Sequence, residues 1–113
     1  MKFKASCSLL ILLNSNFTWK RINKSGITYN KTTKTILTTE SMSDMNDIVI
    51  LLNLYGSLVK ASLFMPLDVF KNGYEHTVHD SNNNISATVK YISDTSIEIC
   101  VDNENWYMQF YCR

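Results

Sequence analysis

The segment that most constrains the fold is a long apolar stretch, SMSDMNDIVILLNLYGSLVKASLFMP at residues 41–66. Ser43 or Asp44 is placed to cap the start of a helix, and Pro66 is placed to stop one. The polar residues of such a helix would form one narrow stripe: Asn46, Asn53, Ser57 and Lys60. The pattern therefore predicts one long central helix over about residues 44–64, lying in a concave sheet or between two layers.

This helix is interrupted too often by polar residues to cross a membrane. A membrane span needs about 20 predominantly apolar residues, and Lys60 would lie inside the bilayer. The same apolar surface could instead be buried between two copies of the chain. A homodimer formed through the helix is therefore kept as an alternative.

Segments on both sides of the helix alternate between apolar and polar residues, with the period of a β-strand that has one buried face. The first forty residues predict a meander of three or four strands. Later strands are predicted at about 74–80, 85–92, 97–101 and 106–112. We therefore predict an α+β fold in one domain over residues 1–113. Its twisted antiparallel sheet of about 6–8 strands, with N-terminal and C-terminal meanders, packs on the helix.

The start of the chain has a second interpretation. MKFKASCSLLILLNSN, residues 1–16, has two lysines before an apolar run, as a signal peptide does. However, no small-residue cleavage site follows Leu13, and the apolar residues from Phe3 onward occupy alternate positions. A strand is favoured over a signal peptide, and we expect a cytoplasmic protein.

The last three strands are predicted to pair in consecutive order. A three-residue loop at 93–95 would pair Tyr91 with Ile97 and keep the apolar residues on one face. The turn DNEN would then close a second hairpin, in which Val101 faces Trp106. This register gives the C-terminal hairpin one apolar side and one polar side.

The C-terminal segment NENWYMQFYCR raises the question of what its aromatic residues do. Alternation sends one set of side chains toward the core: Trp106, Met108, Phe110 and Cys112. The opposite side of the last two strands is the candidate binding surface, formed by Glu98, Tyr107, Gln109, Tyr111 and Arg113, with Cys100 beside them. Tyrosine and arginine are enriched at protein interfaces, so this surface predicts a protein partner.

Composition argues against several other classes of function. Eleven Lys and Arg against ten Asp and Glu give a net charge of +1, which is too weak a field to recruit nucleic acid or an anionic membrane. Three glycines leave little scope for a phosphate-binding loop, and no cofactor is predicted. The three cysteines, Cys7, Cys100 and Cys112, are too few for a disulfide scaffold, so reduced thiols are expected.

GYEHTVHD, residues 73–80, holds both histidines and is the one cluster that resembles a catalytic or metal site. On a strand, however, His76 and His79 would point to opposite faces and could not share a metal ion. A solvated or core-edge pair of histidines is therefore preferred to a metal site. A small metal- or histidine-dependent hydrolase that uses Glu75, His76, His79 and Asp80 is retained as an alternative.

We predict from these observations a non-enzymatic, protein-binding module without a metal. Its size and lack of a catalytic motif suit an inhibitor or immunity protein that neutralises a bacterial toxin by direct binding. Its near-neutral charge is unusual for an inhibitor of a basic nuclease, since opposite charge speeds association. The structural alternative is a homo-oligomeric component of a phage or virion assembly.

Overall fold

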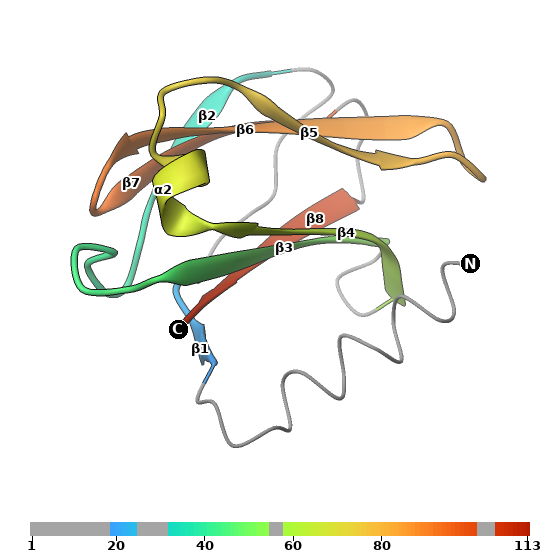
Figure 1. Ribbon diagram of the computed structural model, residues 1–113. Coiled ribbons are helices and arrows are strands. Elements are labelled where there is room, and N and C mark those ends of the chain that lie inside the picture. Colours follow the sequence, from blue (N-terminus) through green and yellow to red (C-terminus); the bar gives the residue numbers. More distant parts are fainter. Residues whose placement is uncertain (1–18, 25–31, 55–57, 102–105) are drawn as a thin grey trace.

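In a computed structural model of the chain, residues 19–24, 32–54, 58–101 and 106–113 are described. These residues form two four-stranded antiparallel sheets that stack face to face (Figure 1). Sheet I has the strand order β1-β8-β3-β4, and sheet II has the order β2-β7-β6-β5. The architecture is a β-sandwich, so the predicted α+β fold is wrong.

Each sheet combines consecutive strands with strands from distant parts of the sequence. Sheet I consists of β1 (Lys20–Arg21), β3 (Asp47–Leu54), β4 (Leu58–Pro66) and β8 (Trp106–Cys112). Sheet II consists of β2 (Lys34–Leu37), β5 (His76–Asp80), β6 (Ile85–Ser93) and β7 (Ser96–Val101). One short helix, α2 (Leu67–Phe70), lies where the chain passes from β4 in sheet I to β5 in sheet II (Figure 1).

The segment predicted as the helix over 44–64 forms most of the β3–β4 hairpin instead. Ile48 pairs with Met65 and Ile50 pairs with Leu63, in antiparallel register. The prediction failed because β3 is buried on both faces, and a strand of that kind has a continuous apolar run that periodicity cannot distinguish from a buried helix. No helix among the described residues is long and apolar enough to span a membrane.

The main core lies between the sheets and takes alternate residues from the strands of both. Its fully buried members include Ile50 and Phe110 from sheet I, and Ile97 and Ile99 from sheet II. Phe70 of α2 is also fully buried there. Alternation therefore predicted correctly that Trp106, Met108, Phe110 and Cys112 face the core.

Of the two hairpins predicted for the last three strands, the first is observed and the second is not. Tyr91 pairs with Ile97 as expected, but the extra residue is a bulge near Ile92 rather than part of a three-residue loop. The second hairpin is wrong, because β7 belongs to sheet II whereas β8 pairs with β3 and β1 in sheet I. Val101 and Trp106 thus share the core between the sheets but are not cross-strand neighbours.

Other predictions are only partly covered by the described residues. The strand proposed for residues 1–13 and its alternative as a signal peptide lie outside them. The strands predicted after residue 73 are observed as β5, β6, β7 and β8. Cys100 and Cys112 are both free thiols and lie in different sheets.

Candidate functional site

The outer face of sheet I, which points away from the main core, carries a second apolar cluster. Alternate residues of β3 point there, and two of them, Val49 and Leu51, are 0% and 3% exposed. Side chains from neighbouring segments pack against them: Trp19, Val59 and Tyr111. An outward face of an antiparallel sheet is ordinarily polar, so buried aliphatic residues set this face apart.

Aromatic rings surround this second cluster. Trp19 meets Phe64 of β4 edge to face, with ring centroids 6.2 Å apart and planes at 75°. Phe64 keeps 48% of its surface exposed. Tyr111 is half-buried on β8, directly opposite Val49 of β3. The face thus has an apolar centre with rings that stay partly open to solvent.

Arg113 closes one end of the face. Its guanidinium lies over the Trp19 ring, 4.5 Å from the centroid, and its Nε donates to Asp47 Oδ2 at 3.1 Å. Backbone bonds from Asn46 and Asp47 to the Arg113 carbonyl, at 2.7 and 3.1 Å, fix the same end. Arg113 is therefore held in place by stacking and by an ion pair, and Arg in such a setting is a common anchor at interfaces.

A pair of amide side chains extends the face along β3 and β8. Asn53 is 1% exposed, and its Nδ2 donates to Gln109 Oε1 at 2.7 Å. The Asn53 Oδ1 atom is buried and accepts no hydrogen bond from the residues that the structure describes. An unsatisfied buried acceptor costs about 1–3 kcal/mol, and such groups in folded proteins are exceptions that call for an explanation.

Arg21 and Tyr107 lie farther along the same face. The Arg21 guanidinium is 5.4 Å from the centroid of the Tyr107 ring, and its Nη2 donates to the Tyr107 hydroxyl. The Tyr107 hydroxyl in turn donates to the backbone carbonyl of Lys24 at 3.4 Å. These contacts give Arg21 a defined orientation although it is exposed.

The outer face of sheet II is different in character. Its central positions pair polar residues across strands, as Lys90 does with Glu98, and Thr88 with Cys100. Glu98, predicted as part of the binding surface, is on this face, across the sandwich from Tyr107 and Gln109. The structure therefore brings together four of the five predicted binding residues, Tyr107, Gln109, Tyr111 and Arg113, and separates Glu98 from them.

The two histidines lie on opposite faces of β5, as predicted for a strand. His79 is exposed, with its Nδ1 2.7 Å from Ser86 Oγ. His76 is half-buried, and its ring is 5.8 Å from that of Phe70. Asp80, 3% exposed, accepts hydrogen bonds from the Asn82 backbone and the Asn83 side chain within the following turn. In the part of the chain that the structure describes, no group of three or more His, Cys, Asp or Glu residues could hold a metal ion.

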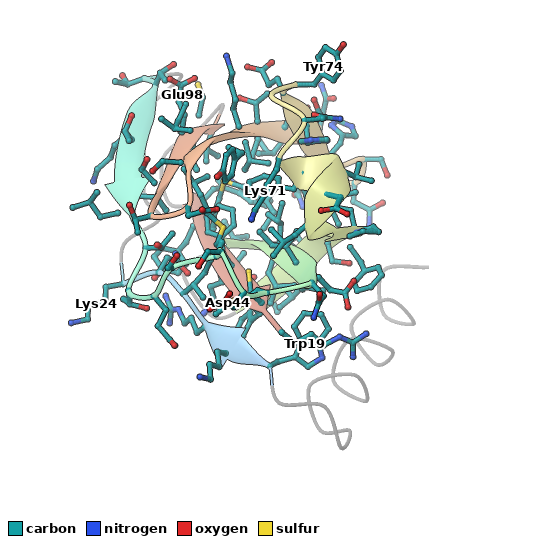
Figure 2. All side chains as sticks on the ribbon, turned by 60° about the vertical axis from the view of Figure 1, so that its left-hand side comes forward. Trp19, Lys24, Asp44, Lys71, Tyr74 and Glu98 are labelled. Carbon is teal, nitrogen blue, oxygen red and sulfur yellow. The ribbon has the colours of Figure 1, made fainter. Side chains whose placement is uncertain are left out.

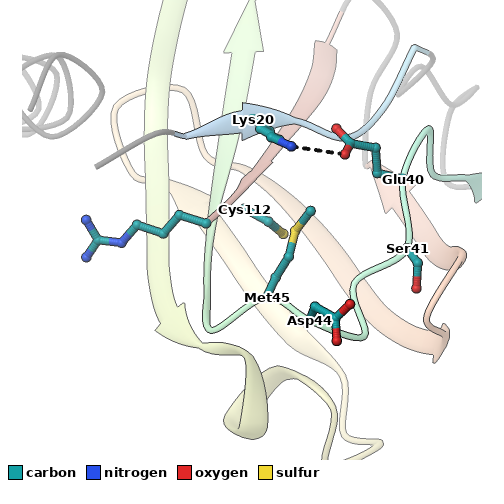
Figure 3. Close-up of a pocket in the computed structure, with 7 residues that line it drawn as sticks. Lys20, Glu40, Ser41, Asp44, Met45 and Cys112 are labelled. Atoms are coloured by element: carbon teal, nitrogen blue, oxygen red, sulfur yellow. Dashed lines mark hydrogen bonds and ion pairs between the residues drawn. The ribbon is translucent and has the colours of Figure 1, made fainter. Parts of the chain in front are cut away.

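A pocket of about 370 Å³ lies beside the C-terminal end of β8, on the side of the main core. It is lined by Lys20, Glu40, Ser41, Asp44, Met45, Cys112 and Arg113. Figure 3 shows the side chains of Cys112 and Met45 between the Lys20–Glu40 ion pair, at 3.4 Å, and Asp44. Burial raises the pKa of the Cys112 thiol to about 12, so this thiol stays protonated near neutral pH and is a poor nucleophile.

Several residues of the outer face were not identified as site residues from the sequence. Trp19 and Arg21 occupy alternate positions in the sequence, but nothing in the sequence links their segment to the C-terminal strand. Val49, Leu51 and Phe64 were missed because their segment was predicted as a helix. Their signal would have been β-branched residues followed by YGS, a turn-forming sequence between two strands.

Comparison with known proteins gives no family for this arrangement. No protein-family model matches the sequence, and searches of the curated proteins and of the solved structures returned no match.

Proposed function

We propose that this chain acts by binding another protein through the outer face of sheet I. The observation that carries the proposal is the second apolar cluster around Val49 and Leu51, with partly open rings and two oriented arginines about it. Interfaces combine an apolar centre with Trp, Tyr and Arg anchors that are already ordered before binding. Among the described residues, the outer face of sheet II has no comparable buried apolar cluster.

The inhibitor or immunity function expected from the sequence is a specific form of this proposal. In that form, the ordered outer face would cover the active site of a toxin. Rigid side chains favour such binding because little conformational entropy is lost on association. The toxin class stays a prediction.

The experiment is co-purification of the tagged full chain with the product of the neighbouring gene. A stable one-to-one complex is expected, and Tyr111→Ala should weaken it by at least about tenfold, as truncation of a central interface residue does. Glu98→Ala is the matched control on the opposite outer face and should leave the affinity unchanged. Circular dichroism of each variant separates loss of binding from loss of folding.

Two results would contradict the proposal. One is a complex whose affinity is unchanged by Tyr111→Ala and also by Phe64→Ala. The other is a complex that is weakened by Glu98→Ala but not by Tyr111→Ala, because that would place the interface on sheet II.

A further inference from the structure

The edge of sheet I at β1 carries a cluster of positive charge. Lys20, Arg21 and Lys24 fall within five residues, and all three side chains are exposed. Figure 2 shows Trp19 and Lys24 at the two ends of this segment. Lys20 forms an ion pair with Glu40 at 3.4 Å, whereas Arg21 and Lys24 form none with the carboxylates of the described residues. The chain as a whole is close to neutral, so this local excess is not a consequence of its composition.

The position of Arg21 suits it to bind a carboxylate. Its guanidinium is oriented by the Tyr107 ring and by the bond to the Tyr107 hydroxyl, which occupies one of its nitrogens. A guanidinium has five N–H donors in a planar fork that matches a carboxylate. Because stacking already restricts the side chain, less rotamer entropy is lost when the remaining donors bind a partner.

The distribution of acids around the face also favours an anionic partner. Asp47 lies at the end of the face beside Arg113 and is engaged by it at 3.1 Å. Glu40 is engaged by Lys20 beside the pocket. The Tyr107 hydroxyl contacts both the Arg21 guanidinium and the Lys24 backbone, so this part of the edge offers cations and an aromatic ring without an opposing acid among the described residues.

We propose that the partner presents an acidic segment to this edge, with carboxylates at Arg21 and Lys24 and apolar side chains over Phe64 and Tyr111. The inference rests on the proposed function and names the chemistry of its partner. It points away from basic nucleases and toward a protein with an acidic binding surface, because complementary charge speeds and orients association.

The test uses two synthetic peptides as probes against the full chain. One alternates glutamate with leucine, and the other alternates lysine with leucine. The glutamate peptide should bind more tightly by at least about tenfold at low salt, and the difference should shrink as salt screens the charges. Amide and arginine Nε NMR signals should shift at Arg21 and Tyr107.

Charge-reversal variants localise the effect. Arg21→Glu and Lys24→Glu should each weaken binding of the glutamate peptide, whereas Lys34→Glu on β2 should not, although it changes the net charge equally. Lys24→Glu is the cleaner variant, because the contact that the structure gives Lys24 is made by its backbone carbonyl. Thermal unfolding of each variant confirms that it is folded.

Three outcomes would overturn the inference: preference for the lysine peptide, equal effects of Lys24→Glu and Lys34→Glu, or binding of a single-stranded oligonucleotide without binding of the glutamate peptide. The proposed function fails separately. If the native complex is lost with Tyr111→Ala but unaffected by Lys24→Glu, the face does bind a protein, and the proposed acidic segment of that partner is wrong.

Discussion

The two sheets of this sandwich share one core but differ on their outer faces. Sheet I buries Val49 and Leu51 outside as well as Ile48 and Ile50 inside. Sheet II exposes or half-exposes the corresponding positions, such as Thr88. Both sheets satisfy the requirement for one buried face, so the second cluster of sheet I is an addition that the sandwich itself does not need. A surface feature that the fold does not require is a candidate for a functional role.

The largest difference between the sheets should appear in stability. Leu51→Ala removes a side chain that is 3% exposed and packed in the second cluster. It should lower the free energy of unfolding by about 2–4 kcal/mol, as truncation of a buried leucine does. Thr88→Ala, on the outer face of sheet II, should change it by less than about 0.5 kcal/mol. Urea unfolding measures both, and similar values would show that the outer faces do not differ.

Each sheet contains one described cysteine, so the reactivities of the two thiols can be compared. Cys112 of sheet I is fully buried and its pKa is raised to about 12, whereas Cys100 of sheet II is half-buried. In a Cys7→Ser background, alkylation of native Cys112 should be about a hundredfold slower than that of Cys100, because only the accessible thiolate reacts. Mass spectrometry of peptides measures both rates, and urea should abolish the difference. Equal rates in the native protein would show that Cys112 is not protected.

The smallest effect concerns a polar cluster at the β6–β7 turn of sheet II. Asp94 accepts a hydrogen bond from the Tyr91 hydroxyl at 2.7 Å and pairs with Lys71 at 3.0 Å. The bond from Tyr91, and then that from Lys71, hold the pKa of Asp94 below its ordinary value. The cluster ties this turn to the residue that follows α2, because Lys71 is its C-cap.

A lowered pKa makes this contribution depend on acid pH in a definite direction. The stability from Asp94 is present above its unfolded-state pKa and is lost as the pH falls through its folded-state pKa. Asp94→Asn should therefore lower stability slightly near neutrality, where Asp94 is ionised, and should weaken the dependence of stability on pH below about pH 4. Tyr91→Phe, which removes the hydrogen bond but keeps the ring, should act in the same direction. Urea unfolding at several acid pH values measures this, and an unchanged slope in both variants would contradict it.

The strands that were predicted well from the sequence are those with one solvent-exposed face. In β8, Trp106 and Met108 alternate with the half-buried Tyr107 and Gln109, so both the strand and its inward side followed from the residues. In β3, Val49 and Ile50 are both fully buried, and no alternation was left to detect. The second cluster makes the outer face of sheet I a candidate site. The burial of β3 in that cluster is also the reason why β3 was not predicted as a strand.

The candidate site was predicted in part for the same reason. Tyr107, Gln109 and Tyr111 lie on β8 and Arg113 follows its last residue, so local alternation was enough to group them. Glu98 was added through a hairpin that does not form, because β8 pairs with β3 and β1 instead of β7.

What the sequence alone determined is which side of β8 each residue takes, since that follows from the two-residue period of a single strand. What only the tertiary structure decided is which strands lie beside it. β8 is placed between β1 and β3, and this brings Arg21 to Tyr107 and Asn53 to Gln109. The physical reason is that alternation is a local property of the backbone, whereas strand neighbours are chosen by the burial of apolar surface from segments far apart in the chain.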